Sequence, residues 1–136
     1  MQRRMLSRED EEAAGPEVEV RREDQAKINK FSRLHQRELN LEEQLQALLK
    51  KKEELDDIST ELELVDDEDD KVPYKIGDAF FQVKAKKALK MVETSQTEKE
   101  QEIATLEESL SSVREDMTHL KVELYARFGR SINLET

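Results

Sequence analysis

Five leucines recur at intervals of seven residues along the first half of the chain: Leu34, Leu41, Leu48, Leu55 and Leu62. A second series with this spacing follows in the last third: Ile103, Leu110, Met117 and Leu124. Heptad spacing places apolar side chains on one face of a helix, and that face has to be buried against another helix. The segment between the two series contains Pro73 and Gly77 and breaks the helical pattern. The spacing therefore predicts a mainly α chain, whose two long helices fold back on each other as an antiparallel coiled coil.

Steps of three and four residues complete the apolar face of each predicted helix. The predicted coiled-coil seam consists of Leu41, Leu45, Leu48, Leu55, Leu62, Ile103, Leu106, Leu110, Val113, Met117 and Leu120. Folding back across the break places Leu48 near Ile103, and it brings the polar residues Lys52, Gln96 and Lys99 into one region. Polar residues in a seam weaken it but fix its register. We therefore expect one weak layer and a single pairing of the helices.

The pattern divides the chain into five segments. Residues 1–20 are highly charged, contain Gly15 and Pro16, and lack apolar periodicity, so a disordered N-terminal tail is expected there. The remaining boundaries place the first helix at 21–65, an acidic turn and β-hairpin at 66–84, the second helix at 85–128, and a C-terminal tail at 129–136.

Composition limits the function. Charged residues make up 41% of the 136 residues, hydrophobic ones 35%, and the formal net charge is −10. That charge disfavours nucleic acid and anionic membrane as partners. No apolar run approaches the ~20 residues of a membrane span, and cysteine is absent. The leucine series also suggests a leucine-zipper DNA-binding protein, but Arg21 and Arg22 are followed by Glu23 and Asp24 instead of a basic helix. We expect a soluble cytoplasmic protein.

Catalytic and metal-binding patterns are also missing. The sequence has no nucleophile motif and no glycine-rich phosphate loop, and a two-helix coiled coil offers no enclosed pocket, so we expect no enzyme and no cofactor. His35 and His119 lack a third ligand for a metal. Residues 61–70 include seven acidic residues, but a calcium loop starting at Asp66 would need glycine at Lys71 and glutamate at Gly77. Repulsion in this acidic run is expected to end the first helix.

The break between the helices has the composition of a β-hairpin with a turn at Gly77 and Asp78. Its apolar residues, which we predict to mediate oligomerisation, are Val72, Tyr74, Ile76, Phe80, Phe81 and Val83. An isolated hairpin is marginally stable in water. Two arrangements remain open: the hairpin packs on its own coiled coil, or it joins a sheet that several subunits share.

Three segments resemble the prefoldin family, in particular its β-type subunits. They are Glu23-Asp-Gln-Ala-Lys-Ile-Asn-Lys-Phe31, Pro73-Tyr-Lys-Ile-Gly-Asp-Ala-Phe80 and Leu124-Tyr-Ala-Arg-Phe-Gly-Arg-Ser-Ile-Asn-Leu-Glu135. The resemblance spans about residues 18–135, and the arginine-containing start corresponds to nothing in the family. It implies a hexamer of two α-type and four β-type subunits whose hairpins form a shared β-barrel. The coiled-coil arms would hold unfolded proteins, such as actin and tubulin, for the cytosolic chaperonin without nucleotide.

The resemblance also implies a client-binding tip at the free end of the arm. The residues carried over to it are Ile28, Phe31, Leu34, Leu124, Tyr125, Phe128, Ile132 and Leu134. Independently, Tyr125 and Phe128 lie beyond the regular seam and face the polar stretch 22–25, so frayed apolar groups are expected there. The alternative is that they close the last layer of the coiled coil. The rival function is a structural tether or adaptor in another multiprotein complex.

Overall fold

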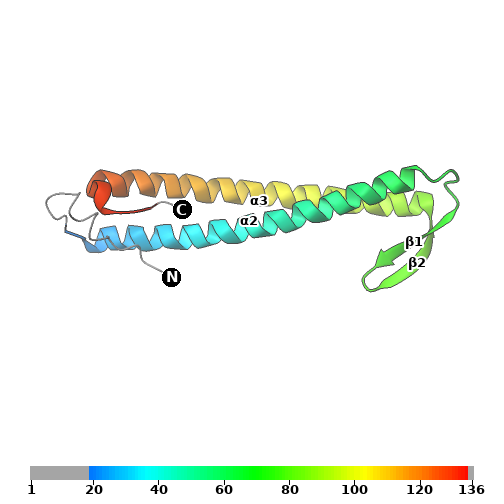
Figure 1. Cartoon of the computed structure of the whole chain (residues 1–136), viewed down its shortest axis with the longest axis horizontal. Coiled ribbons are helices and arrows are strands. Elements are labelled where there is room, and N and C mark those ends of the chain that lie inside the picture. The colour runs from blue at the N-terminus through cyan, green and yellow to red at the C-terminus, as the bar shows by residue number, and fades with distance from the viewer. Residues whose placement is uncertain (1–18, 135–136) are drawn as a thin grey trace. The chain divides into compact units, whose positions relative to one another are not determined.

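The computed structural model describes residues 19–134, which form two helices joined by a β-hairpin (Figure 1). The elements are α2 (Arg22–Glu63), β1 (Lys71–Ile76), β2 (Ala79–Lys84), α3 (Ala85–Phe128) and a 3₁₀ turn, η1 (Gly129–Ser131). The fold predicted from the heptads is confirmed, and both helices begin and end within two residues of the expected positions. The expected N-terminal tail falls almost wholly on residues 1–18, outside the described part of the chain.

The chain packs as two compact units, and each contains part of both helices. The first, called the terminal unit here, joins residues 19–43 to residues 108–134. The second, called the hairpin unit, comprises residues 44–107.

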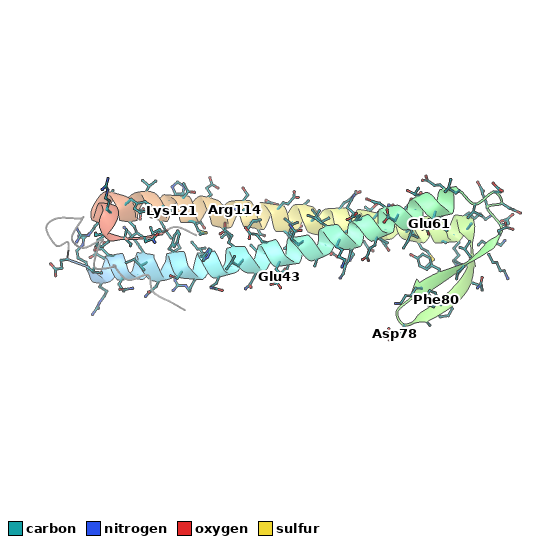
Figure 2. All side chains as sticks on the ribbon, in the orientation of Figure 1. Glu43, Glu61, Asp78, Phe80, Arg114 and Lys121 are labelled. Atoms are coloured by element: carbon teal, nitrogen blue, oxygen red, sulfur yellow. The ribbon has the colours of Figure 1, made fainter. Side chains whose placement is uncertain are left out.

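In the terminal unit α2 and α3 run antiparallel. Arg114 of α3 pairs with Glu38 of α2 at 3.0 Å, and Lys27 pairs with Glu123 at 3.1 Å, so residue numbers fall on one helix as they rise on the other. The buried apolar core between the helices consists of Ile28, Phe31, Leu41, Leu110, Val113, Met117, Leu120, Leu124 and Phe128. Figure 2 marks Arg114 on α3. These contacts follow the predicted register.

In the hairpin unit α2 and α3 are again antiparallel, and the core between them is thinner. Gln96 donates a hydrogen bond to Asp56 at 2.9 Å, and Lys52 lies 3.9 Å from Glu100. The polar layers therefore meet as the spacing predicted. Ala88, Val92 and Ile103 of α3 are buried, whereas the seam leucines of α2 in this unit are half-buried: Leu45, Leu48, Leu55 and Leu62. Small and polar partners cover a leucine less completely than another leucine does.

The hairpin is a two-stranded antiparallel sheet. Its register pairs Val72 with Val83 and Tyr74 with Phe81, and the strands are joined by the two-residue turn predicted at Gly77 and Asp78. Gly77 has φ +63°, a left-handed conformation that tight hairpin turns require and that glycine adopts without strain. Figure 2 marks Asp78 at the turn and Phe80 on the strand that follows.

The acidic run between α2 and β1 also caps α3. The backbone N–H groups of Ala85 and Lys86 donate to the carbonyl oxygens of Asp70 and Glu68 at 2.8 and 3.0 Å. The Asp69 carboxylate lies 3.0 Å from Lys86 Nζ, and this hydrogen-bonded pair lowers the pKa of Asp69. α3 has no acidic residue in its first turn, and the loop between α2 and β1 supplies carbonyl oxygens that accept from its first backbone N–H groups. The acidic run was expected only to end the first helix by charge repulsion, and in the structure it also supplies acceptors to α3.

Candidate functional site

The hairpin presents one wholly apolar face. The strand register and the alternation of side chains put six residues on this apolar hairpin face: Val72, Tyr74, Ile76, Ala79, Phe81 and Val83. Val72, Tyr74 and Val83 are half-buried, but Ile76 and Phe81 keep 49% and 50% of their surface exposed. The part of this face nearest the turn is therefore uncovered within the described chain.

Phe80 lies on the opposite face, and it is 70% exposed. It is paired with Lys75 across the sheet, and Lys71 and Lys84 form the pair at the far end of the same face. In the described residues the sheet has only two strands, so the outer edge of each strand has no strand beside it. Exposed backbone edges with apolar side chains favour pairing with strands of another chain. Five of the six residues predicted for oligomerisation lie on the apolar hairpin face, and Phe80 does not.

The eight residues predicted for client binding all lie in the terminal unit, but most are covered. The buried ones, each less than a tenth exposed, are Ile28, Phe31, Leu124, Phe128, Ile132 and Leu134. Leu34 is half-buried, and only Tyr125, at 37%, counts as exposed. The frayed end expected from the sequence is therefore not what the structure shows. The four buried residues on α2 and α3 belong to the core of the helix pair, and the assignment of all eight residues to client binding stays a prediction.

Two of the buried residues, Ile132 and Leu134, lie beyond α3 in residues 129–134, called the C-terminal strap here. Gly129 adopts φ +57°, which ends α3 and turns the chain back, so that the last described residues lie alongside the helices (Figure 1). The Ser131 hydroxyl donates to the Phe128 carbonyl, and the Leu134 N–H donates to the Tyr125 hydroxyl at 3.3 Å. The heptad pattern ends at residue 128, so residues 129–136 were expected to form a C-terminal tail. The available signals were a glycine directly after the helix and two apolar residues spaced as on an extended strand.

A buried ion-pair cluster lies where α2 begins. The Asp24 side chain is 3% exposed and accepts hydrogen bonds from Arg127 Nε at 2.7 Å and from the Arg21 backbone N–H at 3.0 Å. Arg127 also donates to the Glu19 carbonyl at 2.7 Å. Burial alone would raise the pKa of Asp24, but the hydrogen bonds from Arg127 and Arg21 outweigh it and hold that pKa well below its usual range. Asp24 therefore caps α2 and ties it to the last turn of α3.

Other kinds of site find little support in residues 19–134. That part of the chain contains no group of three His, Cys, Asp or Glu side chains placed to hold a metal ion. His35 Nδ1 lies 3.4 Å from Glu38 Oε1, a contact between neighbouring turns of one helix. Among the same residues no helix is both long enough and apolar enough to span a membrane. The apolar hairpin face and the strap-covered end are thus the two features that point to protein binding.

The sequence and the fold both resemble those of known proteins. Residues 25–131 match the family described as prefoldin subunit. The chain is 38% identical over 123 residues to prefoldin subunit 4 from Homo sapiens, covering 90% of this chain and 92% of that protein. It is 41% identical over 118 residues to prefoldin subunit 4 from Saccharomyces cerevisiae, covering 87% and 91%.

The crystal structure of the prefoldin beta subunit from Thermococcus strain KS-1 superposes with a TM-score of 0.75, covering 83% of this chain and 98% of that one at 16% sequence identity. At that identity the likeness concerns the fold: two helices and the connection between them. The match over residues 25–131 and the relatives at 38% and 41% identity establish that the chain belongs to the prefoldin family.

Proposed function

We propose that this chain joins two α-type and three further β-type prefoldin subunits in a hexamer that holds unfolded proteins, including actin and tubulin, for the cytosolic chaperonin. Membership of the family supports the coarser statement directly: the chain is a subunit of the prefoldin co-chaperone and assembles with other prefoldin subunits. In this proposal it works in the cytoplasm, without nucleotide or catalysis.

The observation that carries the proposal is the apolar hairpin face. Ile76 and Phe81 remain half exposed although both are large apolar side chains, and the two strands leave their outer edges open within the described chain. Fully burying a large apolar side chain contributes roughly 1.5–3 kcal/mol, so burying the exposed half of each one against hairpins of other subunits would stabilise an assembly by about half that value. Backbone hydrogen bonds along the edges would give the pairing its register.

The proposed client surface is the apolar end of the terminal unit. Residues from α2, α3 and the C-terminal strap concentrate aromatic and branched aliphatic side chains there, including Phe31, Leu124 and Phe128. Apolar side chains bind other apolar segments without demanding a particular sequence, as a holding chaperone requires. With the strap in place, however, little of this surface is accessible.

The test uses the assembled complex. The chain is co-expressed with five prefoldin partner subunits, and the purified complex is mixed with chemically denatured actin while light scattering records aggregation. We expect a hexamer that suppresses aggregation at near-equimolar ratio without ATP, while the same subunits prepared without this chain fail to do so. A complex that contains the chain but leaves aggregation unchanged contradicts the proposal and favours the tether or adaptor.

A further inference from the structure

The face of the hairpin opposite the apolar one is basic, and we call it the basic hairpin face. Its side chains, in their cross-strand pairs, are Lys71 and Lys84, Pro73 and Gln82, and Lys75 and Phe80. All six residues are exposed. Phe80, which Figure 2 marks, keeps 70% of its surface accessible. One large apolar side chain therefore lies in water among three lysines.

Several lysines of this region lie where local structure disfavours them. Like charges that face each other across a sheet repel, and Lys71 faces Lys84 in this way. Lys86 and Lys87 lie in the first turn of α3, at the positive end of the helix dipole. Residues 71–90 contain six lysines and one acidic residue, in a chain whose formal net charge is −10. Natural proteins break such local preferences mainly at functional sites.

Part of this positive charge is balanced within the chain. Asp69 Oδ1 lies 3.0 Å from Lys86 Nζ and 3.8 Å from Lys84 Nζ. Neither Lys71 nor Lys75 forms an ion pair with another of residues 19–134. These two lysines are four residues apart on β1, about 13 Å at the usual rise of a strand. The basic hairpin face thus offers two uncompensated charges with an exposed aromatic ring beside one of them.

We propose that the basic hairpin face binds a short acidic segment of a protein outside the complex, and that an apolar residue of this segment packs on Phe80. The inference rests on the proposed function, because it takes the apolar hairpin face to be the one that assembly covers. Carboxylates of the segment pair with Lys71 and Lys75. The apolar residue lies next to the carboxylate at Lys75, because Phe80 is the cross-strand neighbour of that lysine.

The surrounding charge favours a short segment over a larger polyanion. Residues 66–70, directly before β1, are all acidic, and the chain as a whole is strongly negative. A nucleic acid or an anionic membrane is larger than one face of a two-stranded sheet and would also meet this negative surface. A segment of a few residues contacts the lysines and the ring alone.

Lysines on exposed strands also have a simpler role. They hinder the pairing of strand edges between copies of a chain. That role needs positive charge and does not need an exposed phenylalanine among the lysines. The two roles predict different effects of removing the charges, so one set of variants distinguishes them.

The test measures peptide binding to the assembled complex by fluorescence anisotropy. The probe is a short fluorescent peptide of glutamate and serine with one phenylalanine. One control peptide has glutamine in place of every glutamate, and another has glycine in place of phenylalanine. The variant carries Lys71→Gln and Lys75→Gln. Its matched control carries Lys50→Gln and Lys51→Gln, which remove the same charge from exposed positions of α2. Native mass spectrometry and circular dichroism check incorporation and helix content.

We expect the variant at Lys71 and Lys75 to bind the peptide about tenfold more weakly than the wild type and the matched control, because two ion pairs are lost together. Phe80→Ser should weaken binding of the phenylalanine peptide severalfold and leave binding of the glycine peptide unchanged. The glutamine peptide should not bind. Binding should weaken as salt is added, because the paired charges are exposed.

Equal peptide binding by the lysine variant and the matched control would overturn the inference. Self-association of the lysine variant with unchanged peptide binding would assign the lysines to protection of the strand edges. Tighter binding of a single-stranded oligonucleotide or of anionic vesicles would assign the face to another class of partner. Exclusion of the lysine variant from the complex, or peptide binding by the isolated full chain alone, would show that assembly covers this face. Each of these outcomes contradicts the proposal.

The proposed function has a separate readout, which is suppression of actin aggregation by the wild-type complex. Suppression can fail while the acidic peptide still binds, and it can hold while the peptide does not bind. Failure of the proposed function and failure of this inference are therefore distinguishable.

Discussion

At the scale of single residues, Asp24 shows how a carboxylate is kept charged inside an apolar helix end. Removing a carboxylate from water is costly unless other groups replace its hydration. Here Arg127 Nε, the Arg21 backbone N–H and Arg21 Nε donate at 2.7, 3.0 and 3.3 Å. Because Arg127 also binds the Glu19 carbonyl, one carboxylate fixes the start of α2, the last turn of α3 and the chain before α2. The charged form is the form that the native structure stabilises.

Replacing this carboxylate by an amide, Asp24→Asn, should lower the melting temperature at pH 7, because the amide leaves the Arg127 charge unbalanced. The pKa of Asp24 is lower in the native state than in the unfolded chain, so its stabilisation is present above about pH 4, the unfolded value, and is lost as the pH falls below it. Thermal unfolding followed by circular dichroism should therefore show a difference in melting temperature between wild type and variant at pH 7, and this difference should be smaller at pH 3. Asp116→Asn, at an exposed position of α3, is the control. An equal difference in melting temperature at pH 7 and at pH 3 would contradict the assigned role of the carboxylate.

At the scale of elements, the sequence predicts what depends on local periodicity and misses what depends on tertiary burial. The heptads placed both helices and their register, which the Asp56–Gln96 hydrogen bond at 2.9 Å confirms. Gly77 located the hairpin turn because the turn needs a positive φ there, which glycine adopts without strain. The C-terminal strap was missed because six residues are too few for a periodic pattern. Its burial follows from the surface that two distant helix ends build together, and no local rule contains that surface.

The strap begins at Gly129, and the prediction at this scale concerns that residue. Its φ of +57° is unfavourable for residues with a Cβ atom, although the space around an added Cβ is open. Gly129→Ala should therefore cost about 1–2 kcal/mol through backbone strain alone. Urea unfolding measures this loss, and faster hydrogen exchange at the Leu134 amide should accompany it. Gly129→Asn should recover part of the stability, because asparagine tolerates the left-handed conformation. Equal losses for alanine and asparagine would show that the backbone conformation is not the cause.

At the scale of the whole molecule, net charge and exposed apolar surface have opposite effects on association. A net charge of −10 makes copies of this chain repel one another, whereas the half-exposed Ile76 and Phe81 favour association. The combination favours partners that offer apolar strands without the same excess of negative charge. It is consistent with a family whose complexes contain several different subunits, and it makes self-assembly of this chain unfavourable at low salt. If the hairpin is the assembly surface, it supplies the binding energy, and selectivity for other subunits is partly electrostatic.

The last prediction separates the two faces of the hairpin. Phe81→Asp adds a charge to the apolar hairpin face, whereas Gln82→Asp adds one to the opposite face, one residue further along the same strand. If the apolar face is the assembly surface, Phe81→Asp should weaken incorporation into the complex by at least about 30-fold, the effect of losing a central interface residue. Gln82→Asp should enter the complex nearly as well as the wild type. Native mass spectrometry of co-expressed subunits measures the incorporated fraction, and circular dichroism confirms that both variants keep their helices. Equal incorporation of the two variants would mean that the faces are not distinguished, and exclusion of Gln82→Asp alone would assign assembly to the face that carries Phe80.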